Sequence, residues 1–391
     1  MNNGTPMTRY AQIALVAIFF AILWLPLADN LLHLDRSHPS EENRTLAPPP
    51  RMDDTAQALK EFPQSFGAYY DDHFGFRNFL VRQFHTVNFG WFGLADPEKV
   101  VKGKDGWLYL GRKVLIDESR GFNPLADGEV QAWATKLNEI RTWQEARGGT
   151  FLLVLVPDKQ RVFPEYLPDW YVPSERRRKD QLIAALAPLG TPVLDVTEAL
   201  RSAKVSSPDP VWLKTDTHWN GVGAWYGYGA ILDRLHEAHA GLQPLAREAL
   251  VRSQEPGPGA EAWRSTGDLA GLLGVRDLIP ERWLGLLPAA PRAKSTESYP
   301  KPSRKVGGVN VPYATVVDDP KLPSALVIGG SFRWALVPLL SEHFRRVLYT
   351  DFRYCFFDPA LAEAEKPDVI LFVLTEQQLV WFPEPPGETT W

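Results

Sequence analysis

The feature that most constrains the fold is a short segment built entirely from apolar residues, Phe151 to Val156. A strand without polar residues needs cover on both faces, as in parallel sheets flanked by helices. Further strands are expected at 192–195, 326–328, 346–349 and 369–374, and helices at 127–146, 178–189, 221–239, 332–340 and 359–365. This alternation predicts a doubly wound, mostly parallel α/β domain.

A candidate nucleophile follows one of these strands. The strand around Leu326 to Ile328 leads into two glycines, then Ser331, then an expected helix. Glycines permit a tight turn and close approach of a substrate, and N–H groups at a helix start can hold a developing oxyanion. The alternative is that Ser331 only caps the helix, which serine does well.

A candidate acid and base lie together in a second segment, Lys214 to Asn220. Asp216 and His218 are two residues apart just before a helix, where an irregular turn lets their side chains meet. Asp216 would then hold His218 in one tautomer, and Ser331 would complete a Ser-His-Asp triad. Two alternatives stay open. Asp216 and Thr217 could be turn and cap residues, or the Asp-x-His pair could bind a metal, for which no third ligand is evident.

Other residues near these segments are candidates for oxyanion or substrate contacts. Ligands of doubly wound folds bind beyond the carboxyl ends of strands. Lys159 follows one such end, Gly330 and Arg333 flank the serine, and Trp219 could shield the acid–base pair from water. We therefore expect substrate contacts from these four residues, and we assign no metal and no cofactor.

The N-terminus carries an apolar stretch. Ala11 to Ala28 contains no charged residue, and as a helix it would span about 27 Å, close to a bilayer core of roughly 30 Å. Arg9 before it and Asp29 and Asp35 after it favour an inside N-terminus and export of the remainder. The alternatives are a cleaved signal peptide and a buried helix of a soluble protein. We expect an uncleaved anchor.

These features predict the organisation of the whole chain. We expect a cytoplasmic tail at 1–10, a transmembrane anchor at 11–32, an extended Pro-rich spacer at 33–60 and a catalytic domain at 61–391, with 251–315 as an insertion or long loops. The formal net charge of −5 argues against nucleic acid as a partner. The single cysteine, Cys355, excludes an internal disulfide.

Several ordered motifs together resemble one family. Besides Asp216-Thr217-His218-Trp219, the matching segments are 42–47, 72–77, the hairpin-like 101–110, 156–168, 213–224 and 366–370. This set resembles the alginate O-acetyltransferases of the AlgJ and AlgX type, within the SGNH-hydrolase-like superfamily. Gly330-Ser331-Phe332 and Glu376-Gln377 depart from the usual pattern. The layout is closer to the AlgJ type, because no room remains for a carbohydrate-binding module before Trp391.

The resemblance implies an acetyltransferase that acts on an exopolysaccharide. Asp216, His218 and Ser331 take the family's acid, base and nucleophile positions. It also implies a single-pass protein of the bacterial inner membrane with its catalytic domain in the periplasm, supplied with acetyl groups by a membrane-bound O-acyltransferase. The alternatives are a carbohydrate acetylesterase, which would use the same triad with water as acceptor, and a non-catalytic subunit of a polysaccharide-secretion complex.

Overall fold

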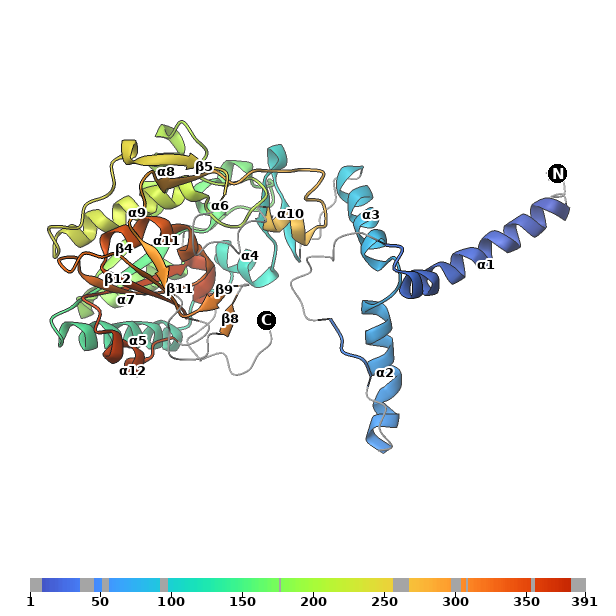
Figure 1. Ribbon diagram of the computed structural model, residues 1–391, viewed down its shortest axis with the longest axis horizontal. Helices are drawn as coiled ribbons and strands as arrows, with labels where there is room; N and C mark the ends of the chain where they lie inside the picture. Colours follow the sequence, from blue (N-terminus) through green and yellow to red (C-terminus); the bar gives the residue numbers. More distant parts are fainter. Residues whose placement is uncertain are drawn as a thin grey trace. The chain divides into compact units, whose positions relative to one another are not determined.

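The computed structural model describes residues 9–35, 46–50, 56–91, 98–175, 177–255, 267–296, 304–306, 309–352 and 356–380. The family landmark at 42–45 and the single Cys355 lie outside these described residues. The chain forms two compact units (Figure 1). The first comprises residues up to Ala95 together with Gly271–Leu278, and the second comprises Asp96–Ala270 and the chain from Ile279.

The first unit is helical. Helix α1 (Arg9–Leu32) has a mean hydropathy of 2.3 over its most apolar window. It is the one helix in the described part of the chain that is long and apolar enough to span a membrane, a test that a signal sequence also passes. Helix α2 (Ala56–Asp72) begins inside the segment expected to be an extended spacer, so that expectation is wrong for residues 56–60. Helix α3 (Arg77–Gly90) follows α2 in the chain.

The second unit is built on a seven-stranded sheet in the order β4-β3-β13-β11-β12-β10-β7. Five consecutive strands of this sheet run parallel to one another: β4 (Val193–Asp195), β3 (Thr150–Val156), β13 (Val369–Thr375), β11 (Ser324–Gly329) and β12 (Arg346–Asp351). Strands β10 (Tyr313–Val316) and β7 (Lys294–Thr296) extend the sheet in antiparallel pairing. The mostly parallel α/β fold predicted from the apolar strands is confirmed.

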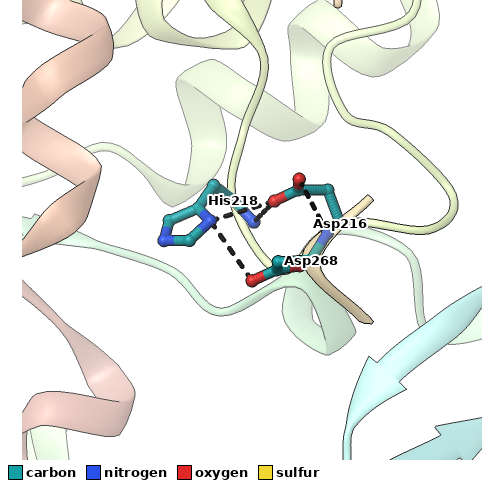
Figure 2. A group of neighbouring side chains, drawn as sticks. All are labelled: Asp216, His218 and Asp268. Carbon is teal, nitrogen blue, oxygen red and sulfur yellow. Dashed lines mark hydrogen bonds and ion pairs between the residues drawn. The ribbon is translucent and has the colours of Figure 1, made fainter. Parts of the chain in front are cut away.

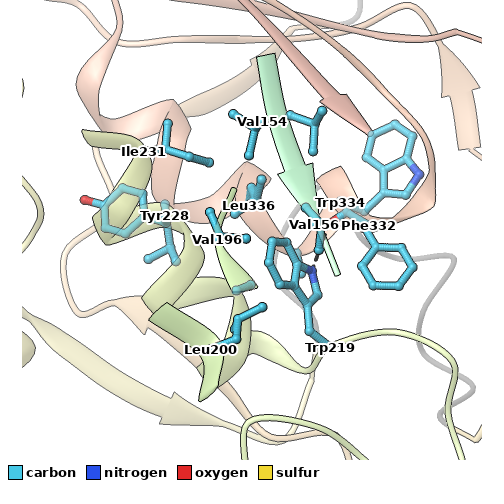
Figure 3. Close-up of a cluster of buried hydrophobic side chains, with 14 of the residues drawn as sticks. Val154, Val156, Val196, Leu200, Trp219, Tyr228, Ile231, Phe332, Trp334 and Leu336 are labelled. Carbon is cyan, nitrogen blue, oxygen red and sulfur yellow. Dashed lines mark hydrogen bonds between the residues drawn. The ribbon is translucent and has the colours of Figure 1, made fainter. Parts of the chain in front are cut away.

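Helices cover both faces of the sheet, and successive residues of the central strands enter two different cores. Leu152, Val154 and Val156 pack with helices α8 (Thr197–Ser206), α9 (Gly221–His236) and α11 (Val337–Leu340), as Figure 3 shows in part. The intervening Leu153 and Leu155 pack with α5 (Asp127–Glu145), α7 (Arg178–Leu186) and α12 (Pro359–Glu365). This two-sided burial explains why the stretch from Phe151 to Val156 contains no polar residue.

Smaller elements complete the second unit. An antiparallel hairpin, β1 (Val100–Lys102) and β2 (Leu108–Leu110), turns at Asp105-Gly106 as the sequence predicts. Short helices α4 (Lys113–Ser119) and α6 (Lys159–Val162) follow β2 and β3 in turn. The expected helix after Ser331 is a 3-10 helix, η6 (Ser331–Leu336), that continues into α11.

The described residues of the region 251–315 form more regular structure than the expected insertion or long loops. It contains the antiparallel pair of β5 (Leu250–Ser253) and β6 (Gly285–Pro288), the short helix α10 (Asp268–Leu272) and the pair of β8 (Arg304–Val306) and β9 (Val309–Val311). It also supplies the two antiparallel strands of the main sheet. The domain boundary at residue 61 stays a prediction; in the structure, residues 56–91 belong to the first unit.

Candidate active site

The candidate nucleophile lies just beyond the carboxyl end of a central strand. Strand β11 ends at Gly329, Gly330 has an extended backbone conformation, and Ser331 opens the 3-10 helix η6. The side chain of Ser331 is half-buried, whereas Phe332 directly after it is buried. The chain therefore presents the serine at the edge of the sheet where doubly wound folds bind ligands.

The acid and base meet this serine in one hydrogen-bonded line. Nδ1 of His218 lies 2.9 Å from Oδ1 of Asp216, and Nε2 of His218 lies 2.8 Å from Oγ of Ser331. The N–H of His218 also donates to Oδ1 of Asp216 at 2.9 Å. Such a chain lets a carboxylate orient an imidazole that in turn accepts the serine proton. The structure thus brings together the three residues that the sequence selected.

The loop that carries the acid is held by a buried lysine. Nζ of Lys159 donates to the backbone oxygens of Leu108 at 2.7 Å, Lys214 at 2.7 Å and Asp216 at 2.9 Å. Burial lowers the pKa of Lys159 to about 7, against nearby carboxylates that favour the charged form. Because an ammonium has three donors and all three are engaged, Lys159 supports the loop, and its expected contact with substrate is corrected to this role.

A glutamate holds the other side of the same loop. Oε1 of Glu281 accepts from the N–H of Lys214 at 2.9 Å. Its Oε2 accepts from the N–H and from Oγ1 of Thr215, each at 2.6 Å. Glu281 is 67 residues from Lys214 in the chain. The conformation of the acid loop therefore depends on distant residues rather than on its own sequence.

A third support comes from the segment Gly267 to Ala270. The N–H groups of Gly267 and Asp268 donate to Oδ2 of Asp216 at 2.9 and 3.2 Å. In return, Oδ1 of Asp268 accepts from the N–H of Thr217 at 2.6 Å. Oδ2 of Asp268 lies 3.6 Å from Nδ1 of His218, so two carboxylates face the same edge of the imidazole (Figure 2). Asp268 is a site residue that the sequence analysis missed.

The two carboxylates have pKa values shifted in opposite directions. Burial alone would raise the pKa of Asp216, but hydrogen bonds from His218 and from the N–H of Asp268 outweigh it and lower that pKa. Burial and the charge of Asp216 raise the pKa of Asp268. Water reaches 38% of the Asp268 side chain and screens part of this effect. Asp216 is thus the carboxylate kept ionised beside the base.

The turn before the serine is held by a buried ion pair. Nη1 of Arg333 lies 3.0 Å from Oδ2 of Asp351, and both side chains are fully buried. The same nitrogen donates to the backbone oxygens of Gly329 and, at 2.6 Å, Gly330. Arg333 therefore points into the protein and supports the turn, and its expected oxyanion or substrate contact is corrected accordingly.

Trp219 also points inward. It is fully buried among the residues of Figure 3, and its Nε1 donates to the backbone oxygen of Phe332 at 3.0 Å. The ring of Phe332, rather than that of Trp219, packs against His218, with ring centres 4.8 Å apart. The expected shielding by Trp219 is thus provided by Phe332. Gly330 stays a candidate for the oxyanion site.

A metal was not expected because no third ligand was evident in the sequence, and that reason is wrong. Asp216, His218 and Asp268 each place one possible ligand atom within 4.8 Å of the others. In the structure, however, Nδ1 of His218 is hydrogen-bonded to Asp216, which is the arrangement that a general base requires. We therefore interpret the group as catalytic and assign no metal to it.

A small polar hollow opens beside the acid loop. It is lined by Leu110, Leu115, Asp158, Lys159, Gln160, Thr217 and Gln377. Burial, together with the charges of Glu376 and Glu118, raises the pKa of Asp158 well above its usual value. The hollow thus has an apolar wall from β2 and α4, and it contains a buried acid whose pKa is raised.

The architecture and the triad geometry can now be set beside known proteins. A family model described as "SGNH hydrolase-like domain, acetyltransferase AlgX" matches residues 100–351, more than half of the chain. The chain belongs to this family. The match confirms the resemblance noted in the sequence, and it includes every residue of the Asp216–His218–Ser331 line.

Relatives of this family member include probable alginate O-acetylases named AlgJ. The protein of Pseudomonas syringae pv. tomato is 30% identical over 222 residues, which cover 56% of this chain and 51% of that protein. The protein of Pseudomonas aeruginosa is 25% identical over 289 residues, which cover 72% and 68%. The chain thus matches about half the length of the first relative. These relatives place it in a polysaccharide O-acetyltransferase family.

Solved structures support the fold. Bacillus cereus PatB1 with a sulfonyl adduct has a TM-score of 0.53 at 16% identity, covering 73% of this chain and all of that one. A DHHW family protein from Eubacterium siraeum has a TM-score of 0.50 at 17% identity, covering 72% and 95%. Both likenesses confirm the SGNH-like α/β fold of this family member.

Proposed function

We propose that this chain moves acetyl groups to hydroxyls of a secreted or periplasmic polysaccharide through an acyl-enzyme on Ser331. The observation that carries the proposal is the hydrogen-bonded line from Asp216 through His218 to Ser331, in a member of an O-acetyltransferase family. A scaffold subunit has no need of this line, because only proton transfer requires the three side chains at these distances.

In the first half-reaction, Ser331 accepts the acetyl group. Nε2 of His218 takes the Oγ proton as the serine oxygen attacks the acetyl carbonyl carbon of the donor. The tetrahedral intermediate collapses, the bond to the donor oxygen breaks, and His218 returns the proton to that oxygen. Asp216 holds Nδ1–H and stabilises the transient imidazolium. The proposed oxyanion donors are backbone N–H groups at the start of η6.

In the second half-reaction, a sugar hydroxyl replaces the donor. His218 removes the hydroxyl proton, the sugar oxygen attacks the ester carbonyl carbon on Ser331, and the Ser331 oxygen leaves with the proton from His218. Acetyl is thereby transferred without net gain or loss of protons. Water in place of the sugar would give acetate, which is the reaction of an esterase.

The N-terminal helix supports a proposal for the cellular location of the protein. Helix α1 has 24 residues, about 36 Å of helix, which suffices to cross a bilayer. We propose that it anchors the chain in the bacterial inner membrane with the second unit in the periplasm. A membrane-bound O-acyltransferase is the proposed acetyl donor there, and an alginate-like polysaccharide is the proposed acceptor.

Mass spectrometry of the full-length chain tests the proposal. The protein is incubated with p-nitrophenyl acetate and a panel of uronic-acid and neutral oligosaccharides. We expect one acetyl group on a peptide containing Ser331, followed by acetylated sugar. The control is Ser206→Ala, which removes an exposed serine hydroxyl on α8. Unchanged turnover in Ser331→Ala would reject both enzymatic functions, and acetate without acetylated sugar would favour an esterase.

A further inference from the structure

Asp268 is the charged group near the triad that the proposed mechanism leaves unused. Its Oδ1 accepts from the N–H of Thr217 at 2.6 Å, which fixes the carboxylate on the acid loop. Its Oδ2 then lies 3.6 Å from Nδ1 of His218, too far for a hydrogen bond but close for an electrostatic contact (Figure 2). Oδ1 of Asp216 meanwhile accepts from Nδ1 at 2.9 Å.

We infer that Asp268 is a positioning residue that acts through His218: its negative charge stabilises the imidazolium formed at each proton transfer. The inference rests on the proposed function, because it presupposes that His218 is the base. A unit charge at this distance, screened as strongly as in water, changes a proton equilibrium by about tenfold. Asp216 orients the ring through a hydrogen bond, whereas Asp268 contributes charge without one.

The surroundings of Asp268 support a role for its charge. The charged groups around it are Asp216, His218 and Lys159. Burial and Asp216 raise the pKa of Asp268, which means that the charged form costs stability in the folded protein. A residue present only to cap the N–H of Thr217 could do so as a neutral amide, without that cost. The retained charge therefore points to a function at the neighbouring imidazole.

The sign of the stability effect follows from this shift. A carboxyl whose folded pKa is raised contributes stability below its unfolded pKa, and that contribution is lost as the pH rises through the folded pKa. At pH 8, wild-type Asp268 is charged and carries the full cost. Removing its charge at pH 8 should therefore leave the protein at least as stable, provided that the N–H of Thr217 keeps an acceptor.

Asp268→Asn separates charge from structure, because the asparagine oxygen can still accept from the N–H of Thr217. With the full-length chain and p-nitrophenyl acetate, we expect kcat/KM to fall about tenfold at pH 8. The acid limb of the pH profile should move about one unit to lower pH, because the imidazolium is less stabilised. The urea midpoint at pH 8 should stay equal or rise. Asp268→Ala removes both features and should lose activity and stability.

Glu281→Gln is the matched control, because Glu281 also holds the acid loop, through the N–H groups of Lys214 and Thr215. It should change stability without moving the pH profile. Wild-type activity and pH profile in Asp268→Asn would overturn the inference. So would equal losses in Asp268→Asn and Asp268→Ala with a lower urea midpoint in both, which indicates a structural role. If Ser331→Ala stays active, the proposed function itself fails.

Discussion

The two halves of the triad are built in opposite ways. Ser331 follows a strand and two glycines, and its turn is held from within by Arg333, two residues further along the same chain segment. The loop of Asp216 and His218 is instead held by Lys159, Glu281 and Asp268, which come from three separate parts of the sequence. The nucleophile turn is mainly a local structure, whereas the base loop is assembled by tertiary contacts.

This difference has a physical origin. A parallel strand ends at a defined sheet edge, so the sheet itself delivers Ser331 to the site. The base loop has no repeating hydrogen-bond pattern of its own, and its buried backbone groups need partners from elsewhere. Lys159 and Glu281 supply these partners as charges, whose hydrogen bonds are stronger than neutral ones. The base loop should therefore be the more fragile half of the site.

The largest expected effect concerns the coupling of the two halves. His218→Ala and Ser331→Ala should each lower kcat about 10⁴-fold or more, and the double variant should be no worse than either, because triad residues act as a unit. Steady-state kinetics with p-nitrophenyl acetate measure all three variants. Losses that multiply in the double variant would mean that the two halves perform separate tasks.

Breaking the ion pair under the nucleophile should cost the most stability. Arg333→Met removes the arginine that neutralises the buried charge of Asp351, which should lower the free energy of unfolding by about 3–5 kcal/mol. Urea denaturation measures this loss. Arg333→Met combined with Asp351→Leu should recover part of it, since no buried charge then remains. A loss below about 1 kcal/mol in the single variant would contradict the role assigned to this pair.

Removing the lysine under the base loop should reduce stability less than Arg333→Met does, but it should reduce activity more. Lys159→Met removes the amine that donates to three backbone oxygens, which should lower the free energy of unfolding by about 3 kcal/mol. The loop then shifts His218, and a misplacement of about 1 Å costs roughly 100-fold in rate. Lys204→Met, at a partly exposed lysine bonded to Val162 and Glu165, is the control and should retain activity. Full activity in Lys159→Met would show that the loop holds its own shape.

The smallest expected effects on stability come from substituting one glycine in each half of the site. Gly267 has a φ of +76°, so Gly267→Ala should cost about 1 kcal/mol through backbone strain. Gly330 has a φ of −83°, and a methyl group there would meet only the end of the Gln378 side chain. A double-mutant cycle between Gly330→Ala and Gln378→Ala should show coupling of about 1 kcal/mol. Additive losses of stability in that cycle would mean that the Gly330 methyl group is not in conflict with the Gln378 side chain.

The parts of the site that the sequence reveals are those with local patterns. Ser331 is visible because an apolar strand and two glycines precede it. Asp268 and Glu281 have no such pattern, because their contacts span 51 and 66 residues. Lys159 was expected to contact substrate, since nothing in the sequence shows that three backbone oxygens surround its amine.

The same reason explains the errors for Arg333 and Trp219. Both lie next to a residue of the proposed triad in the chain, and proximity in sequence suggested proximity to substrate. Side-chain direction is decided by packing: a 3-10 helix turns Arg333 toward Asp351, and the core beside α9 takes up the Trp219 ring. The fold was easier to predict, because the apolar composition of its central strands is enough to predict that they are buried.

The bond from Nε1 of Trp219 to the carbonyl of Phe332 joins the residue after the base to the residue after the nucleophile. Because this hydrogen bond is buried, the distance between the imidazole and the serine is fixed by the protein core. The acetyl donor and the acceptor sugar would then bind to a site in which His218 and Ser331 are already within hydrogen-bonding distance, so that catalysis needs no closing movement. Substrate selection would fall to the rim of the site, and the rim could change between relatives while the spacing of the reacting atoms stayed the same.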